Sequence, residues 1–352
     1  MSNPWAILTS DWHLRLGGRV WATHPHLHGD IEFGLSQVQA YIKEYDPPNI
    51  FLAGDMIHEP RMDSYIVSLL NNFLDCCCGS NDIYFVQGQH DLSNPTVLGT
   101  FCRYAKHLDN LTIQNSGITV AGLDYRRPKQ ITQALDEAPE ADVLLTHQSW
   151  TETMGEYGAA VLPEKYKLVC SGDFHSHFLY RKNNTVLLSP GTLCMQRISE
   201  PPDHSIWLIN DDLTYKSLPL KSRRYFEYEI QTKEDLQTFL EDWVLLSAAQ
   251  LQTDVPDDVA KNIVRINYNP TIDDVVLKLN TVINNEAHVF LKPVHNIILE
   301  QRKETVVAPT NLVSILETVY PNDNRVGDAK KLLKTNNLTE AVLEICERYG
   351  FV

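Results

Sequence analysis

Residues 49–58 read Asn-Ile-Phe-Leu-Ala-Gly-Asp-Met-Ile-His, and this stretch decides how we interpret the whole chain. The apolar run 50–53 predicts a short buried strand. Gly54 ends the run where the chain can turn sharply, and the carboxylate of Asp55 follows at once. A carboxylate at the end of a buried strand is costly unless a partner stabilises it. Asp55 is therefore the first candidate metal ligand.

The same pattern recurs at four other places in the chain. Each is an apolar stretch that predicts a strand, followed directly by a histidine, an aspartate or a side-chain amide. These clusters are Asp11 with His13, Gln89 to Asp91, His147, and Asp173 to His177. When parallel strands alternate with helices, their carboxyl ends lie along one edge of the sheet, where ligands bind. We therefore expect all five clusters to meet in one crevice and bind metal.

Composition and charge limit the classes of function. The 352 residues are enough for two or three domains, and 43% of them are hydrophobic. No apolar run reaches the ~18 residues of a membrane span, and the first residues lack the basic start of a signal peptide. An odd count of seven cysteines favours reduced thiols, so we expect a cytoplasmic protein. The net charge of −15 opposes nucleic-acid binding unless metal ions or a basic partner offset it.

The pattern of predicted elements divides the chain into three regions. Residues 1–222 alternate strands with helices, and their later strands read as hairpins, so we expect mixed sheets. Residues 223–300 follow the strand-helix-strand-helix-strand order of a small α+β domain, and residues 301–352 predict only helices. The helices predicted in the first region lie at 32–45, 62–75, 95–107 and 129–137.

The ordered motifs resemble those of the calcineurin-like metallophosphoesterases. They are Asp-x-His at 11–13, Gly-Asp at 54–55, Gly-x-His-Asp at 88–91, His at 147 and Gly-x-x-His at 172–175. Within that superfamily, residues 54–58 and the Ser-Pro-Gly-Thr turn at 189–192 are most similar to the SbcD-type DNA nucleases. The motifs cover about residues 5 to 220. Beyond them only the layout is similar, and the compact tail resembles that of bacteriophage-encoded relatives.

The resemblance implies a fold and a division into domains. The fold is α/β: a four-layer metallophosphoesterase sandwich of two mixed β-sheets flanked by helices, with a small α+β capping domain and C-terminal helices. Residues 1–222 would form the nuclease domain and residues 223–300 the capping, DNA-binding domain. Residues 301–352 would form the helical region that binds an ATPase partner.

The resemblance also implies the ligands of two divalent metal ions. Asp55 would bridge both ions. The ligands of the first ion would be Asp11, His13 and His175, and the ligands of the second ion would be Gln89, His147 and Asp173.

Two of these ligands depart from the superfamily's pattern. Gln89 stands where the family has asparagine, and Asp173 stands where it has the first histidine of Gly-His-x-His. Both keep a donor atom, and a carboxylate suits Mn²⁺ or Mg²⁺ better than an imidazole does. An alternative register makes His175 and His177 the histidine pair.

The resemblance implies three catalytic residues. His90 would protonate the leaving oxygen, Asp91 would orient His90, and His58 matches a position associated with handling the DNA end. Other side chains near the motifs are candidate substrate contacts. The rings of Trp12 and Tyr125 would either stack on a base or pack, and Arg126 would either contact phosphate or be solvated. The candidate contacts are Trp12, Tyr125, Arg126 and His177.

The function that the resemblance implies is metal-dependent hydrolysis of DNA phosphodiester bonds. The protein would be an exonuclease and endonuclease that works with an SbcC-type, SMC-like ATPase in DNA recombination, repair or replication. We expect Mn²⁺ as its metal, with Mg²⁺ as the alternative, and a homodimer through the helices at 62–75 and 95–107. A phage-encoded protein would act in the host cytoplasm. Two alternatives stay open: a phosphoesterase for small phosphodiesters or phosphoproteins, and a scaffold of the same fold with little turnover.

Overall fold

A computed structural model describes most of the chain. The described residues are 2–15, 27–58, 64–77, 81–93, 104–196, 200, 203–223, 225–249, 262–269, 271 and 287–293. The chain divides into the units Met1–Val294 and His295–Val352. The C-terminal helices predicted within 301–352 lie outside the described residues. The division into domains at 1–222, 223–300 and 301–352 stays a prediction. Within the described part, no helix has both the length and the apolar character needed to cross a membrane.

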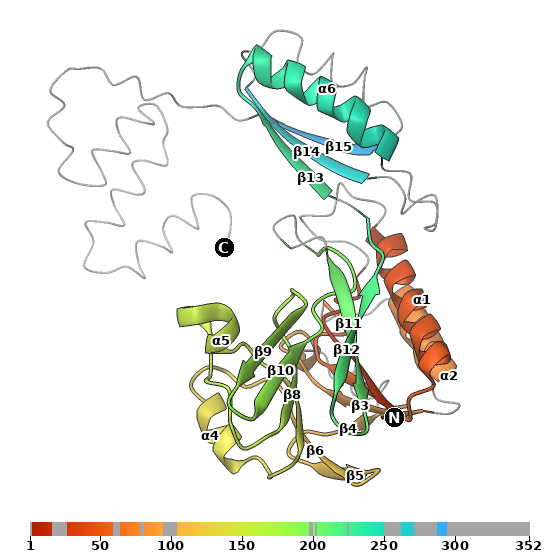
Figure 1. The fold of residues 1–352 in the computed structure, drawn as a ribbon, viewed down its shortest axis with the longest axis vertical. Coiled ribbons are helices and arrows are strands. Elements are labelled where there is room, and N and C mark those ends of the chain that lie inside the picture. The colour runs from red at the N-terminus through yellow and green to blue at the C-terminus, as the bar shows by residue number, and fades with distance from the viewer. Residues whose placement is uncertain are drawn as a thin grey trace, which may run out of the picture. The chain divides into compact units, whose positions relative to one another are not determined.

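The first sheet has six strands in the order β12-β11-β1-β2-β3-β4 (Figure 1). The parallel strands β1 to β4 come first in the chain, and β11 and β12 add an antiparallel hairpin beside β1. The strands are β1 (Pro4–Thr9), β2 (Asn49–Ala53), β3 (Asp82–Val86), β4 (Lys106–His107), β11 (His204–Asn210) and β12 (Tyr215–Leu220).

The second sheet has six strands in the order β5-β6-β7-β8-β10-β9. Its four middle strands are parallel, and both edge strands are antiparallel to their neighbours. The predicted mixture of parallel strands and hairpins is therefore confirmed in both sheets. The strands are β5 (Thr112–Asn115), β6 (Ile118–Leu123), β7 (Val143–His147), β8 (Leu168–Gly172), β9 (Phe178–Lys182) and β10 (Thr185–Ser189).

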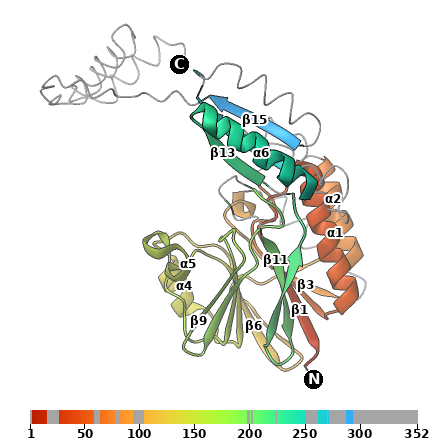
Figure 2. The ribbon, with the colours of Figure 1, turned by 45° about the horizontal axis from the view of Figure 1, so that its top comes forward.

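The central strands of both sheets are buried on both faces. Their side chains therefore contribute to three apolar layers, which hold the sheets and helices together. In β2, Phe51 faces the core between the sheets, while its neighbour Ile50 faces the core under the helices α1 and α2. In β7, Leu145 faces the central core and Leu144 the core under α4. This alternation follows the two-residue period of a strand. The predicted four-layer sandwich is confirmed, as Figure 2 shows from the side.

The helices lie on the outer faces of the two sheets (Figure 2). Those predicted at 32–45, 62–75 and 129–137 are confirmed with small shifts in their bounds. The helix predicted at 95–107 lies mostly outside the described residues, and its end is wrong, because Lys106–His107 pair with β3 as strand β4. The helices are α1 (Leu27–Tyr45), α2 (Ser64–Cys77), α4 (Ile131–Glu137) and α5 (Thr151–Met154), with short 3-10 turns at Asp91–Ser93 and Gly155–Tyr157.

A third, all-parallel sheet follows in the order β13-β14-β15. Its elements are β13 (Tyr225–Ile230), α6 (Lys233–Ala249), β14 (Asn262–Tyr268) and β15 (Ala287–Pro293). Thr232 and Asp235 form a capping box at the start of α6: Thr232 Oγ1 accepts from the Asp235 amide at 3.1 Å, and Asp235 Oδ2 accepts from the Thr232 amide at 2.8 Å. The predicted helix after β14 lies outside the described residues.

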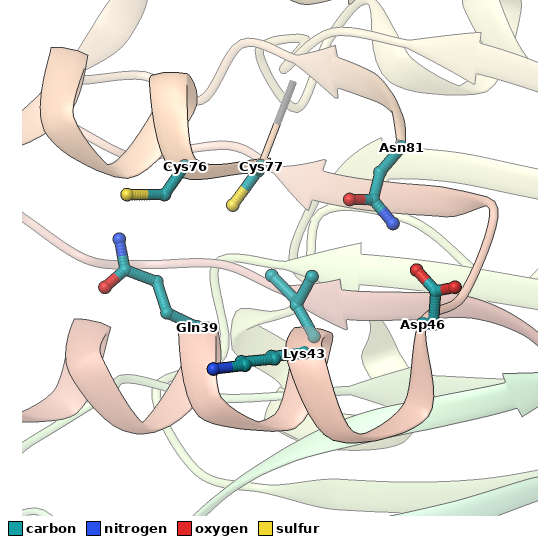
Figure 3. A pocket seen from close by; sticks show the side chains of 7 residues that line it. Gln39, Lys43, Asp46, Cys76, Cys77 and Asn81 are labelled. Atoms are coloured by element: carbon teal, nitrogen blue, oxygen red, sulfur yellow. The ribbon is translucent and has the colours of Figure 1, made fainter. Parts of the chain in front are cut away.

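A hollow of about 350 Å³ lies between α1 and α2 (Figure 3). Gln39 and Lys43 line it from α1, and Cys76 and Cys77 from the end of α2. The other lining residues include Asn81, which directly precedes β3. The hollow is therefore at the edge where β2 and β3 begin, opposite the edge where the five polar clusters were expected.

Candidate metal centre

The polar residues after β1, β2 and β8 have an unusual backbone conformation. The φ angles of Asp11, His13 and Asp55 are 52°, 47° and 53°, and that of Asp173 is 80°. Residues other than glycine seldom adopt this left-handed region, and such strain is concentrated at functional sites. The amides of Asp11 and His13 donate to the carbonyls of Gly54 and Asp55, each at 3.0 Å, so the first two loops are tied together.

Glycines allow these loops to approach each other. Gly54 has a φ of +85°, and a Cβ there would lie 2.5 Å from Nδ1 of His147. A Cβ at Gly88 would collide with Oδ1 of Asp55. Side chains at these two positions would therefore displace an imidazole and a carboxylate from the crevice.

The first expected ligand set comes together as predicted. Asp11, His13 and His175 have ligand atoms within 4.8 Å of one another. Nε2 of His13 and Nε2 of His175 are 3.0 Å apart, and each lies 3.9 Å from Oδ1 of Asp11. Burial raises the pKa of Asp11 to about 6, although the imidazoles of His147 and His175 oppose this effect. Burial also lowers the pKa of His13, so its imidazole is neutral and can bind metal.

The second set is centred on His147. Its Nδ1 lies 2.7 Å from the carbonyl oxygen of Ala53, which can only accept, so Nδ1 carries a proton and, in the neutral imidazole that binds metal, Nε2 carries the lone pair. That Nε2 is 3.4 Å from Oδ2 of Asp55 and 3.8 Å from Oδ1 of Asp173. The buried atoms without a hydrogen-bond partner include His147 Nε2, Asp55 Oδ2 and Gln89 Oε1. Three ligand atoms of the expected second set are thus buried, and no hydrogen bond satisfies them.

Asp55 lies between the two sets. Its Oδ2 is 3.4 Å from His147 Nε2 on one side and 3.9 Å from His13 Nε2 on the other. Burial alone would raise the pKa of Asp55, but the charge of His147 outweighs it and holds the pKa below its usual value. An ionised carboxylate is what a bridging position requires.

The two unusual residues of the second set contact each other. Nε2 of Gln89 donates to Oδ1 of Asp173 at 2.8 Å, which leaves Oε1 of Gln89 as its free ligand atom. The longer side chain of glutamine, compared with asparagine, spans to the aspartate that replaces histidine. Both departures thus belong to one local arrangement, in which the amide and the carboxylate remain oxygen donors.

His90 and its expected partner Asp91 both contact backbone groups. Nδ1 of His90 donates to the carbonyl oxygen of His58 at 2.7 Å, and Nε2 lies 4.0 Å from Oδ2 of Asp55. The buried Asp91 accepts from the backbone amides of Gly88 and Ile57, at 3.0 and 3.1 Å. Asp91 thus ties the loops after β2 and β3 to each other through their backbone. The expected role of Asp91 in orienting His90 stays a prediction.

His58 contacts a metal ligand rather than standing alone. Its Nδ1 is 3.1 Å from Nδ1 of His13, and its ring stacks on that of His90 with centroids 4.6 Å apart. If Nε2 of His13 binds metal, Nδ1 of His13 carries the proton and donates a hydrogen bond to Nδ1 of His58. The proton of the His58 ring is then on Nε2, which can donate a hydrogen bond to a substrate oxygen. The three rings also form a group close enough to hold an ion themselves.

Two of the predicted substrate contacts pack elsewhere. Trp12 is buried, donates to Thr9 Oγ1 at 2.8 Å and packs edge-on against Phe73, so it cannot stack on a base. His177 stacks on Trp207 with centroids 4.2 Å apart, while His175 joins the ligands. Of the two registers, the structure places His175 in the metal centre. Of the two roles that the sequence left open for Trp12, the structure shows packing. His177 lies apart from the ligands because sequence adjacency to a ligand says nothing about the direction of a side chain.

The other two predicted contacts lie after β6. Tyr125 is half-buried and its ring centroid is 6.4 Å from that of His147, at the margin of the centre. Arg126 is bound by Asp109, whose two oxygens lie 2.7 and 2.8 Å from Nη2. Tyr125 is thus in position to meet a substrate, whereas the guanidinium of Arg126 is already neutralised.

Sequence reasoning missed one residue of the centre. Oε1 of Glu200 lies 2.5 Å from Nδ1 of His175. A single glutamate before the Pro-Pro pair at 201–202 carries no recognisable motif, so only the fold could reveal this contact.

The donor set fits divalent cations. Carboxylate, amide and imidazole groups are the mixed oxygen and nitrogen ligands that Mn²⁺, Mg²⁺ and Zn²⁺ accept. Three of these atoms, Asp55 Oδ2, Gln89 Oε1 and His147 Nε2, are buried without a hydrogen-bond partner, an arrangement that a cation would relieve.

Comparisons with known proteins identify one matching family. The family model of the calcineurin-like phosphoesterase superfamily domain matches residues 7–212. An archaeal phosphodiesterase is similar over 61% of this chain and 99% of its own, with 11% identity and a TM-score of 0.36. A putative 5'-nucleotidase from Staphylococcus aureus is similar over 61% of this chain and 53% of its own, with 12% identity and a TM-score of 0.38. No curated protein matches.

The matched region spans more than half of the chain and contains every residue of the two ligand sets. The second sheet, the ordered motifs and most of the first sheet fall within it, and only the start of β1 and all of β12 lie outside. The chain belongs to the calcineurin-like phosphoesterase superfamily.

Proposed function

We propose that the protein is a two-metal DNA exonuclease and endonuclease that hydrolyses phosphodiester bonds with Mn²⁺. The observation that carries the proposal is the position of Asp55. Its buried Oδ2 has no hydrogen-bond partner and lies between His147 Nε2 at 3.4 Å and His13 Nε2 at 3.9 Å. A single carboxylate oxygen facing two sets of ligands supports a bridged pair of ions.

The residues of the chain divide the work around that bridge. Asp11, His13 and His175 would hold one ion, and Gln89, His147 and Asp173 the other. When bound, the two ions would neutralise the phosphoryl oxygens and promote attack by water. The carbonyl of Ala53 keeps the lone pair of His147 directed at Asp55, so the second site is preorganised.

His90 is suited to the leaving-group step. The carbonyl of His58 fixes the proton on Nδ1, which leaves Nε2 as the nitrogen that faces Asp55. The imidazolium can release its Nε2 proton to the departing oxygen and keep its orientation throughout. His58 would bind the scissile end through its own Nε2–H.

The choice of DNA rests on the motifs at 54–58 and 189–192, which are most similar to SbcD-type nucleases. A chain with a net charge of −15 needs a basic surface from elsewhere to hold DNA. An SbcC-type, SMC-like ATPase would supply it, in recombination, repair or replication in the cytoplasm of a cell or of a phage host. A homodimer would hold both ends of a break.

The test is Mn²⁺-dependent digestion of end-labelled linear duplex DNA by wild type and His90→Ala. Loss of a general acid should lower the rate by ~10²–10⁴, while calorimetry should still find two bound ions. Asp55→Asn is the matched control and should lose both ions. Cleavage of a generic aryl phosphodiester with no cleavage of DNA would replace the nuclease by a phosphoesterase for small substrates.

A further inference from the structure

One ligand imidazole of the metal centre is held by a charged side chain. Nδ1 of His175 lies 2.5 Å from Oε1 of Glu200, and the Glu200 side chain is only 9% exposed. The other ligand imidazoles contact no carboxylate at Nδ1: that of His147 contacts the carbonyl of Ala53, and that of His13 contacts the ring of His58. His175 therefore differs from them in having a carboxylate behind it.

This contact determines which nitrogen of His175 can bind metal. A carboxylate only accepts hydrogen bonds, so Nδ1 carries the proton and Nε2 carries the lone pair. That Nε2 is 3.0 Å from Nε2 of His13 and 3.9 Å from Oδ1 of Asp11. The lone pair thus points into the first ligand set.

Glu200 is itself held at its other oxygen. Its Oε2 accepts from the backbone amide of Gln196 at 2.6 Å. The side chain of Gln196 in turn accepts from Nη2 of Arg15 at 3.2 Å, and both of these residues are buried. The carboxylate is therefore anchored at both ends and cannot turn away from His175 without breaking a second hydrogen bond.

We propose that Glu200 is the positioning residue of the first metal site, which it acts on through His175. The inference rests on the proposed function only in taking His175 as a ligand. A carboxylate behind a ligating histidine fixes its tautomer and ring orientation and raises its basicity, and loss of such a partner costs ~10–100-fold in metal affinity. The second site is independent, because a backbone carbonyl holds His147.

The primary experiment is Mn²⁺ titration calorimetry of the full chain carrying Glu200→Gln. The amide has the shape of the carboxylate but one acceptor oxygen, so it cannot accept from both His175 and Gln196. One of the two sites should weaken by ~10–100-fold while the other keeps wild-type affinity. Glu200→Asp keeps the charge on a shorter arm and should give an affinity between those of wild type and Glu200→Gln.

His177→Ala is the matched control, because His177 lies two residues from His175 but stacks on Trp207 and contacts the carbonyl oxygen of Pro190 at 3.4 Å instead of joining the ligands. It should lower the melting temperature without changing either Mn²⁺ affinity. Wild-type affinities at both sites in Glu200→Gln or in Glu200→Asp would overturn the proposal, and so would equal weakening in His177→Ala. A wild-type chain that binds no Mn²⁺ would instead overturn the proposed function, so the two failures are distinct.

Discussion

At the scale of single residues, the pair Gln89 and Asp173 explains how the second ligand set departs from the superfamily's pattern. The amide donates to the carboxylate at 2.8 Å and keeps its oxygen free. Asparagine is one methylene shorter and cannot do both. The two positions should therefore behave as one unit in mutagenesis.

We predict that Gln89→Asn alone weakens binding of the second Mn²⁺ by ~10-fold, because the hydrogen bond to Asp173 is lost. Asp173→His alone should weaken it similarly, since Gln89 then has no acceptor. The double variant restores the family's asparagine and histidine and should recover most of the affinity. Calorimetry on all four proteins gives the coupling, and strictly additive losses would contradict it.

A second residue-scale prediction concerns His107, which lies outside the metal centre. Burial alone would lower its pKa, but the hydrogen bond and charge of Asp124 outweigh burial and raise it. A raised pKa in the folded protein stabilises it fully below the ordinary imidazole value of about 6.5 and loses that effect as pH rises through the folded value. Wild type should therefore exceed His107→Gln in melting temperature at low pH.

That advantage should shrink as the pH is raised above neutrality. The amide side chain of the His107→Gln variant would keep a donor for Asp124 but cannot gain a proton, so the variant removes the titration and leaves the contact. Thermal melts of both proteins across this range give the difference directly. A difference that grows with pH would show that the His107–Asp124 pair is not charged.

The sequence could identify the ligands but not their partners. Asp11, Asp55 and His147 were predictable because each lies at the end of an apolar strand of a parallel sheet. The contacts of Asp91 with backbone amides and of Glu200 with His175 were not, since these depend on how loops fold over one another. The role of Trp12 could not be decided from the sequence, because an aromatic ring suits both a buried core and stacking on a base.

At the scale of elements, the periodicity of hydrophobic residues determined which helices and strands could be predicted. Long, buried strands such as β2 and β8 have apolar runs that a sequence reveals. The elements that were missed are β4, with two residues, α5, with four, and β9, whose side chains are mostly exposed. β4 and α5 are too short to show a period, and the five residues of β9 do not alternate between apolar and polar.

The capping box of α6 gives the element-scale prediction. Thr232→Ala removes the acceptor for the Asp235 amide and should destabilise the β13–β15 unit by ~1 kcal/mol. Gln237→Ala, on the exposed side of the same helix, should change stability by less than ~0.5 kcal/mol. Urea unfolding measures both. An equal effect of the two substitutions would mean that the cap does not stabilise the helix.

At the scale of the whole molecule, the homodimer and the ATPase partner stay predictions. The apolar side chains of α2 that motivated the dimer are largely used within the subunit: Phe73 is buried against Trp12, and Leu69 packs on the same core. The other residues of that interface, Val97 and Phe101, lie outside the described residues. Light scattering at micromolar concentration decides between dimer and monomer.

The helices predicted over 301–352 carry the whole-molecule prediction. Truncation after Thr305 should leave Mn²⁺ binding and basal nuclease activity intact, since every ligand lies within 7–212. It should abolish association with an SbcC-type ATPase and ATP-stimulated cleavage of duplex DNA. Co-purification of the truncated chain with that ATPase would place the docking site elsewhere.

The left-handed backbone at Asp11, His13, Asp55 and Asp173 has a consequence for the lifetime of the protein. Each such residue costs of order 1 kcal/mol of folding free energy, and the crowded buried ligands add to that cost. An ion that binds only the native state returns ~2.7 kcal/mol at about 100 times its Kd. In a metal-starved cell the chain would therefore unfold more often and be degraded sooner, so metal supply would set the amount of enzyme as well as its activity.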